Sequence, residues 1–145
     1  MFKHILIPTD GSDLSRKAIL YGVQLAKESG AKVTGLTVAE PYRIATMDTV
    51  LIPVDEGDYE EQSRLLSEKA MEQVRMAADA AGVPCETIRE VHDQPYRAII
   101  DAAHALGCDL IVMASHGRRG ISALLLGSET VKVLTHSTIP VLVYR

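Results

Sequence analysis

The sequence predicts an α/β fold, a doubly wound parallel sheet of five strands with helices on both faces. Apolar residues alternate between short continuous runs, as in buried strands, and a spacing of about 3.6 residues, as in amphipathic helices. Five such runs are separated by helices or long crossovers, and strands joined by crossovers of this kind lie parallel. The 145 residues suffice for one core, so we expect a single domain spanning residues 1–145.

The first strand, helix and second strand follow one another closely. We expect a strand at His4–Pro8 and then a helix with Ser12 as its N-cap, because a serine side chain accepts a hydrogen bond from the first turn. Gly30 is expected to end this helix, and residues 32–38 to form the second strand. The buried face of the helix is predicted to comprise Ala18, Ile19, Gly22, Leu25 and Ala26.

A long irregular stretch then precedes a long helix. Residues 39–55 lack regular apolar spacing, and a stretch of this length is typical of a lid, a partner contact or local disorder. A helix is expected at Glu56–Ala81, opened by acidic residues that suit the positive end of its dipole and closed by Gly82. Its buried stripe is predicted to comprise Tyr59, Leu66, Ala70, Val74, Ala77 and Ala81.

The second half of the chain continues the alternation. Cys85–Val91 mixes charged residues with Ile88, which predicts a half-exposed edge strand, whereas Leu110–Ala114 is apolar throughout, which predicts a strand buried on both faces. The other predicted segments are a helix at 94–106 ended by Gly107, a loop at 115–126 with a short helical turn, a helix at about Ser128–His136, and a last strand from Ile139 to Tyr144.

Composition and charge exclude several classes of function. The formal net charge is -4 and aromatic residues make up 4%, which disfavours a nucleic-acid binder, since that function needs a positive field and stacking surfaces. No apolar run approaches the length of about twenty residues needed for a membrane span, and the first residues do not resemble a signal peptide. Cys85 and Cys108 stand apart from each other, as expected of reduced thiols. We therefore expect a cytoplasmic protein.

The stretch after the fourth predicted strand is the most informative for function. Gly117 and Gly120 let the backbone bend and approach a ligand, and Gly127-Ser128 begins a helix whose free amides can bind an anion. This pattern is typical of a phosphate-binding loop, although it is neither a Walker A loop nor a GxGxxG turn. The alternative remains open that the glycines only shape a loop and that Gly127-Ser128 only caps a helix.

Other reactive side chains carry weaker signals. Ser115 and His116 are neighbours in sequence, but adjacent side chains leaving a strand tend to diverge, so we do not expect a nucleophile and base pair. The five histidines are scattered without ligand spacing, so no zinc site is expected.

The chain resembles the universal stress protein family over essentially its whole length. The resemblance rests on residues 5–12 (ILIPTDGS), 111–117 (IVMASHG) and 139–143 (IPVLV). ATP-binding members of that family carry Gly-x-x-Gly, nine residues, and then Gly-Ser or Gly-Thr. Gly117, the nine residues 118–126 and Gly127-Ser128 match this pattern, whereas Ala114 stands where the family has its leading glycine.

The resemblance implies a Rossmann-like sheet in the order 3-2-1-4-5, with an ATP site in the crevice between the first and fourth strands. Asp10, beside Pro8 and Thr9, would contact adenosine, and Val38 would flank the base. Met113 and Ala114 would line the sugar and the base. The amides of Gly117 and Gly127 would face the phosphates, and the side chains of Ser128 and Thr130 would bond phosphate oxygens. Glu129 belongs to the same predicted set, and Arg118 has a guanidinium suited to phosphate, with a solvated loop charge as its alternative.

The expected function is therefore that of a cytoplasmic stress-response protein that binds ATP with Mg²⁺. The nucleotide would act as a conformational switch with slow or no hydrolysis, since no P-loop lysine is present. The resemblance further implies a homodimer through the last strand, which would otherwise be a bare edge. Ala114 keeps an alternative open, a family member that binds no nucleotide and acts as a dimeric interaction module. An adenylate-forming enzyme is disfavoured, because residues 10–15 lack the loop that such enzymes use.

Overall fold

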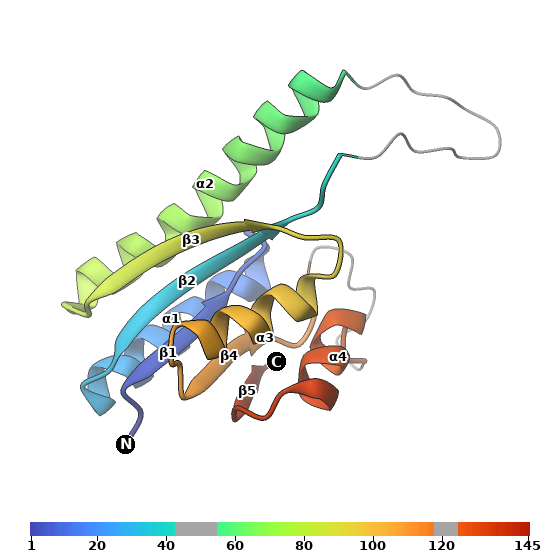
Figure 1. Ribbon diagram of the computed structural model, residues 1–145. Helices are drawn as coiled ribbons and strands as arrows, with labels where there is room; N and C mark the ends of the chain where they lie inside the picture. The colour runs from blue at the N-terminus through green and yellow to red at the C-terminus, as the bar shows by residue number, and fades with distance from the viewer. Residues whose placement is uncertain (43–54, 118–124) are drawn as a thin grey trace.

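The computed structural model describes residues 1–42, 55–117 and 125–145, and these residues form alternating strands and helices (Figure 1). The elements are β1 (His4–Pro8), α1 (Asp13–Ser29), β2 (Lys32–Ala39), α2 (Glu56–Ala81), β3 (Cys85–Val91), α3 (Pro95–Ala105), β4 (Leu110–Ala114), α4 (Ser128–His136) and β5 (Val141–Tyr144). Neighbouring strands pair in parallel in the order β3-β2-β1-β4-β5. The predicted fold class and the strand order implied by the resemblance are both confirmed.

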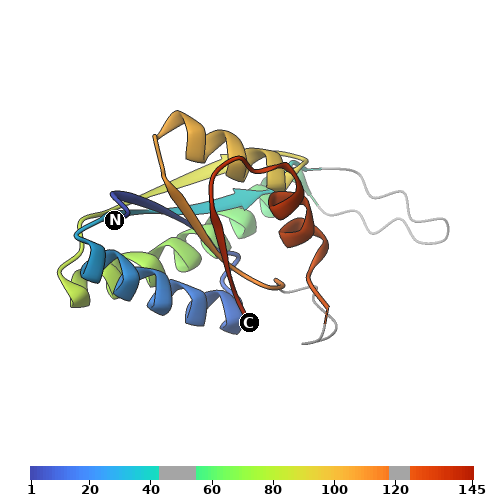
Figure 2. The ribbon, with the colours of Figure 1, turned by 90° about the horizontal axis from the view of Figure 1, so that it is seen from below.

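The sheet separates two hydrophobic cores. Helices α1 and α2 cover one face, and α3 and α4 cover the other, as the view from below makes clear (Figure 2). Side chains alternate between the faces of a strand, so Ile5 and Ile7 enter the first core while Leu6 enters the second. All residues of β1 and β4 are buried, which explains why both strands are apolar runs without alternation.

Helix α1 begins and ends where the sequence predicts. The Ser12 side chain accepts a hydrogen bond from the Ser15 amide, and Gly30 adopts a left-handed conformation, with a φ of 69°. A residue with a Cβ is strained in that conformation, so glycine is favoured at this position. The cap and the glycine fix where the chain leaves β1 and where it re-enters the sheet as β2.

The predicted stripe of α2 is wrong at one position. Leu66 is 52% exposed, whereas its neighbour Ser67 is buried. Ser67 shares the helical spacing of the buried residues Ala70 and Val74, and on this inner face its hydroxyl accepts a hydrogen bond from Arg89 Nε of β3, at 3.1 Å. A polar contact between helix and strand therefore occupies the position that hydrophobicity alone assigned to leucine. Ala70 and Val74 are buried as predicted.

Four predicted boundaries shift by one or two residues, the first of them the end of β2, which lies at Ala39 rather than at Val38. Helix α3 is one residue shorter at each end than predicted, and β5 begins at Val141 rather than at Ile139. Ser137 explains the later start of β5, because its hydroxyl accepts from the Ile139 amide and donates to the Ile139 carbonyl. These backbone groups form a local turn instead of pairing with β4. Most of the irregular stretch 39–55, and the turn predicted within 115–126, lie outside the described residues.

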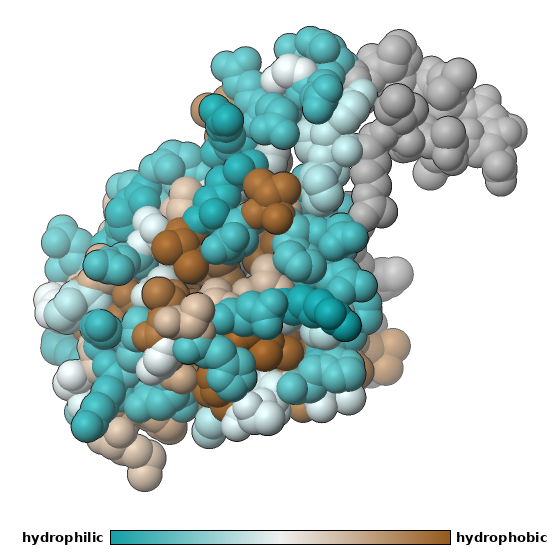
Figure 3. Space-filling view, viewed as in Figure 1, coloured by the Kyte–Doolittle hydropathy of each residue, from teal (hydrophilic) through white to brown (hydrophobic). Residues whose placement is uncertain are grey.

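The surface is mostly hydrophilic over the helices. In Figure 3, hydrophobic side chains gather mainly in the band between α2 and α3, where the edge strand β3 lies. Strand β3 is half-exposed, as its mixed composition predicts. Within the described ranges, no helix is both long and apolar enough to cross a bilayer.

Candidate functional site

A cavity of about 390 Å³ opens at the carboxyl edge of the sheet. It lies where β1 and β4 are neighbours and their following loops lead to opposite faces, the usual ligand position in such sheets. Its lining residues are Pro8, Thr9, Asp10, Ser15, Leu36, Val38, Glu40, Pro95, Ile99, Met113, Ala114, His116, Gly117, Gly127, Ser128, Glu129 and Thr130. Every predicted site residue lines this cavity except Arg118, which lies outside the described residues.

One wall of the cavity is apolar. Leu36 and Val38 come from β2, Met113 from β4 and Ile99 from α3, and all four line the cavity. They lie on the face of the sheet that α3 and α4 cover, because the core on that face contains the same side chains. A flat apolar group such as a nucleobase fits a wall of this composition.

Asp10 and Gly117 bring the loops after β1 and β4 together. Asp10 Oδ1 accepts hydrogen bonds from the Ser12 amide at 3.0 Å and from Ser15 Oγ at 2.8 Å, so its carboxylate has a fixed orientation. Its Oδ2 lies so close to Gly117 that a Cβ at residue 117 would overlap it. Glycine is therefore required here for a close approach and not for an unusual backbone angle, since Gly117 has no positive φ.

The first turn of α4 forms the opposite side of the cavity. The first intrahelical hydrogen bond runs from the Val131 amide to the Gly127 carbonyl, at 3.0 Å. The amides of residues 128–130 consequently have no acceptor within the helix, which is the arrangement that binds anions. Ser128 is exposed at the cavity, so its hydroxyl and these amides form a group of donors facing one place.

Two residues of this turn make contacts that the resemblance did not imply. The Gly127 amide donates to the Ser115 carbonyl at 2.7 Å, so this structure does not offer that amide to a ligand. Thr130 Oγ1 donates to the Ala114 carbonyl at 3.0 Å, and Thr130 is 2% exposed. Both contacts tie the start of α4 to the end of β4, so Gly127 and Thr130 hold the crevice in shape here.

Glu129 joins α4 to α3. Its Oε2 accepts a hydrogen bond from the Tyr96 amide at 2.9 Å, and its Oε1 lies 3.4 Å from Lys132 Nζ. Gln94, the N-cap residue of α3, makes no side-chain cap. Glu129 therefore caps α3 from a neighbouring helix, a role that local sequence reasoning cannot reveal because the two residues are far apart in the chain.

The side chains of Ser115 and His116 lie close together, although we expected them to diverge. Ser115 Oγ lies 3.3 Å from His116 Nδ1, within hydrogen-bonding distance. The expectation was wrong because the chain leaves β4 at Ser115 and no longer alternates side chains across the sheet. Ser115 is 3% exposed, so its hydroxyl is not presented to a ligand, whereas His116 lines the cavity.

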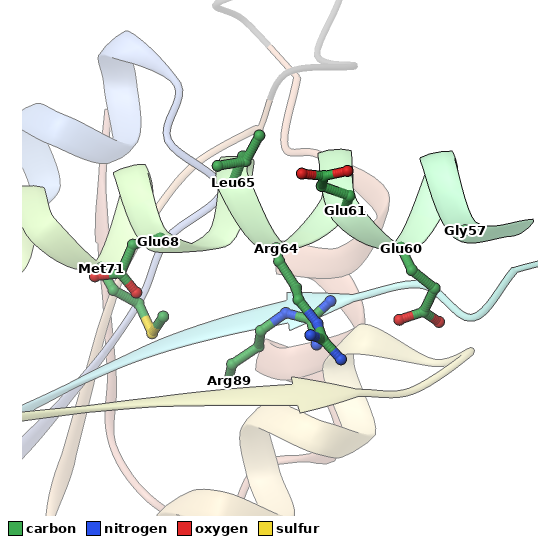
Figure 4. A pocket seen from close by; sticks show the side chains of 8 residues that line it. All are labelled: Gly57, Glu60, Glu61, Arg64, Leu65, Glu68, Met71 and Arg89. Atoms are coloured by element: carbon green, nitrogen blue, oxygen red, sulfur yellow. The ribbon is translucent and has the colours of Figure 1, made fainter.

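A second, larger hollow of about 690 Å³ lies between α2 and β3 (Figure 4). The side chains of Arg64, from α2, and Arg89, from β3, extend towards the space between the two elements. Arg89 donates to Ser67 and Ser63, and glutamates line the same hollow, so charges of both signs are mixed there. The described lining of this hollow comes from residues 57–71 of α2 and from Arg89, and includes no residue of the loops that follow β1 and β4. The smaller cavity is the candidate site on chemical grounds.

Comparisons with known proteins identify the family. The model of the universal stress protein family matches residues 1–145. The chain belongs to the universal stress protein family. It is 36% identical over 151 residues to universal stress protein YxiE of Bacillus subtilis, covering the whole of both chains. It is 34% identical over 148 residues to a universal stress protein of Methanocaldococcus jannaschii, covering this whole chain and 83% of the relative.

Solved structures of universal stress proteins share the fold. Universal stress protein UspA from Lactobacillus plantarum superposes with a TM-score of 0.81 at 24% identity, covering 99% of this chain and 97% of the other. A universal stress protein crystallised in complex with cAMP superposes with a TM-score of 0.71 at 26% identity, with the same coverage of 99% and 97%. The second protein therefore binds an adenine nucleotide on a similar fold.

This family member lines its crevice with some residues that sequence reasoning missed. They are Ser15, Leu36, Glu40, Pro95, Ile99 and His116. Pro95 and Ile99 come from the first turns of α3, which follows β3 at the same edge of the sheet. Glu40 directly follows β2, a position at which an acidic residue contacts ribose in related dinucleotide-binding folds, so the signal was present in the sequence.

Proposed function

We propose that the protein binds an adenine nucleotide, ATP above all, in the crevice between β1 and β4. The observation that carries the proposal is that every described residue of the predicted set lines one cavity at the switch point of the sheet. These residues lie more than a hundred positions apart in sequence, from Pro8 to Thr130. The complex of a 26% identical universal stress protein with cAMP supports the class of ligand.

The wall of Leu36, Val38, Ile99 and Met113 suits the adenine ring, because burial of a flat apolar surface favours binding there. In this proposal, the fixed Asp10 carboxylate accepts a hydrogen bond from the sugar or the base. The free amides of the first turn of α4 and the Ser128 hydroxyl bind the phosphates. Gly127 and Thr130 support that turn rather than contacting the ligand.

Mg²⁺ would accompany a triphosphate in this site. Among the described residues, no three His, Cys, Asp or Glu side chains form a metal-binding group. Mg²⁺ does not require such a group, since it is commonly held by phosphates, water and one or two carboxylates. Asp10, Glu40 and Glu129 line the cavity and fit this mode. The ion would neutralise phosphate charge.

We propose slow or no hydrolysis. The Ser115 hydroxyl is buried, and the sequence contains no P-loop lysine. Occupancy would act instead through conformation. Loops and helix ends from β1, α3, β4 and α4 meet at the cavity, so a ligand that contacts several of them stabilises one arrangement over others.

We further propose a homodimer through β5 and a cytoplasmic location. Strand β5 pairs with β4, lies at the edge of the sheet and is apolar and half-exposed, features that favour pairing with a second copy. The thiols of Cys85 and Cys108 are free, which suits a reducing compartment. If Ala114 prevents nucleotide binding, the dimer itself becomes the functional surface, as in the alternative of an interaction module.

The decisive experiment identifies any small molecule that purified protein releases on denaturation, using chromatography and mass spectrometry. Thermal unfolding with added ATP, AMP and cAMP accompanies it. A ligand at a hundredfold excess over its Kd stabilises the folded state by about 2.7 kcal/mol, which is measurable as a rise in Tm. Released ATP or an ATP-dependent rise supports the proposal. No nucleotide and no rise with any of the three contradicts it and favours the interaction module.

A further inference from the structure

We infer that Glu129 makes the crevice discriminate among nucleotides by the charge of their phosphates. Without a divalent cation, Glu129 favours nucleotides with few phosphate charges, and with Mg²⁺ this preference against ATP is removed. The inference rests on the proposed nucleotide site and adds a residue that determines which phosphorylation state binds.

The carboxylate of Glu129 is held at the place where phosphates are expected. Glu129 is the second residue of α4, next to Ser128 and Thr130, and it lines the same cavity. Its Oε2 accepts from the Tyr96 amide at 2.9 Å, which fixes the side chain between α4 and α3. The carboxylate therefore cannot swing freely into solvent when an anion enters, unless the cap of α3 is broken.

Neighbouring side chains neutralise the negative charge of Glu129 only in part. Lys132 Nζ lies 3.4 Å from Oε1, but the Lys132 and Glu129 side chains are 49% and 36% exposed, so solvent weakens this pair. The other charged side chains that line the described part of the cavity are Asp10 and Glu40, both acidic. A like charge in the first turn opposes the attraction of the helix amides for an anion.

The consequence depends on how many charges the ligand brings. Adenosine brings no phosphate and should be indifferent to Glu129. Each further phosphate adds negative charge beside the carboxylate, so repulsion should increase from AMP to ATP. A bound Mg²⁺ lowers the charge of the triphosphate and attracts the carboxylate, which reverses the sign of the contribution.

The test is isothermal titration of adenosine, AMP, ADP and ATP into the wild type and the Glu129→Gln variant, in EDTA and in Mg²⁺. Glutamine keeps an oxygen that accepts from the Tyr96 amide and loses only the charge. In EDTA, we expect the variant to bind ATP about tenfold and AMP about threefold more tightly, with adenosine changed by less than about twofold. Mg²⁺ should increase ATP affinity more in the wild type than in the variant.

Two further variants make the test specific. Glu28→Gln changes net charge equally but lies near the far end of α1, about 20 Å from Ser15, and should leave all affinities unchanged. Lys132→Met removes the partner of Glu129 and should weaken ATP binding in EDTA. This second variant carries the test if Glu129→Gln does not fold.

The outcomes separate this inference from the proposed function. A uniform shift across the four ligands, or no shift, overturns the inference while leaving the nucleotide site intact, because a purely structural role of the cap would affect all ligands alike. A wild type that binds none of the four ligands overturns both.

Discussion

Gly117 and Asp10 approach each other so closely at the crevice that there is no room for a methyl group between them. In Gly117→Ala, the new Cβ would overlap Asp10 Oδ2. Relieving this overlap moves either the carboxylate or the loop, at a cost of about 1–3 kcal/mol that falls on the ligand site. We expect nucleotide affinity to fall by about tenfold or more in isothermal titration, with a smaller change in Tm.

The matched control for this substitution is Gly57→Ala on α2. A Cβ there lies 3.4 Å from Asp55 Oδ2, an ordinary contact, and alanine favours a helix more than glycine does. Gly57→Ala should stabilise the protein by up to about 1 kcal/mol and leave nucleotide affinity unchanged. Equal affinities for wild type and Gly117→Ala would mean that the Asp10 contact does not shape the site.

His4 is a buried titratable group at the start of the central strand β1, at the end of the sheet opposite the crevice. Its Nδ1 lies 3.2 Å from the Leu106 carbonyl, and its Nε2 lies 2.7 Å from Thr34 Oγ1. A carbonyl can only accept, so Nδ1 carries the proton and Nε2 accepts from the Thr34 hydroxyl. The neutral ring therefore satisfies both partners and joins β1, β2 and the turn after α3.

Burial lowers the pKa of His4 below its ordinary value of 6.5, and the charge of Lys32 acts in the same direction, partly opposed by the Leu106 carbonyl, Asp109 and Glu86. Below about pH 6.5, the unfolded chain binds a proton that the folded chain does not, so stability falls as the solution becomes acidic. We expect the unfolding free energy of His4→Gln to depend less on pH between 7 and 5 than that of the wild type.

Urea denaturation at several pH values measures this difference, and His104→Gln, which changes an exposed histidine, is the control. Parallel curves for His4→Gln and the wild type would show that His4 titrates alike in both states.

The packing of α2 on β2 depends on Gly35. A Cβ at residue 35 would lie 2.9 Å from Val74 Cγ1 and 3.0 Å from Val74 Cβ, closer than such atoms pack. Gly35→Ala should therefore destabilise the fold by about 1–3 kcal/mol. Val74→Ala removes Cγ1 and Cγ2 but keeps Cβ, so it relieves part of the overlap. The double variant should therefore be destabilised by about 1 kcal/mol less than the sum of the two single effects, as measured by urea denaturation.

Gly22→Ala supplies the control for this coupling. Its Cβ would meet Ile7 Cδ1 at 2.7 Å, and Val74 is not among its nearest neighbours. Its effect should therefore add to that of Val74→Ala within about 0.5 kcal/mol. Simple additivity for Gly35→Ala with Val74→Ala would contradict the proposed contact.

The sequence predicts elements well where local chemistry decides them. Ser12, Gly30 and Gly82 mark helix ends by capping or by a left-handed backbone, and the apolar runs of β1 and β4 reflect burial on both faces. The failures arise where distant residues contribute. Leu66 is exposed although it is apolar, whereas Ser67 lies on the same helical face as Ala70 and Val74 and accepts a hydrogen bond from Arg89 of β3, a contact that hydrophobicity within α2 does not reveal.

The residues of the candidate site also divide into those that local sequence predicts and those that distant contacts decide. Asp10 and Ser128 could be placed from strand ends and a helix start, since a parallel sheet brings these ends to one edge. The cap that Glu129 provides for α3, and the contact of Thr130 with Ala114, depend on how α4 packs and could not be predicted. The resemblance supplied the strand order, which local patterns do not determine.

The assembly of the whole molecule depends on which backbone groups of β5 remain free. The Ile111 amide donates to the Pro140 carbonyl, and the Ser115 amide donates to the Tyr144 carbonyl. Backbone groups of alternate residues point to the same side of a strand, so residues 140, 142 and 144 face β4. Val143 therefore directs its amide and carbonyl towards the open edge, where a second copy would pair.

Two proline substitutions in adjacent positions separate folding from assembly. Val143→Pro removes an amide from the open edge, so it should prevent the proposed dimer and leave the fold within about 1 kcal/mol of the wild type. Leu142→Pro removes an amide that faces β4 and should destabilise the fold by about 3 kcal/mol. Sedimentation equilibrium reports the first effect, and thermal unfolding reports the second.

This comparison is informative because both variants carry the same new residue in the same strand. A nonspecific effect of proline would disturb both variants alike, whereas backbone direction predicts opposite sensitivities. If Val143→Pro remains dimeric, the dimer uses another surface, and the open edge of β5 must be protected in some other way. If Val143→Pro is monomeric and still binds nucleotide, the crevice does not need a second chain to be complete.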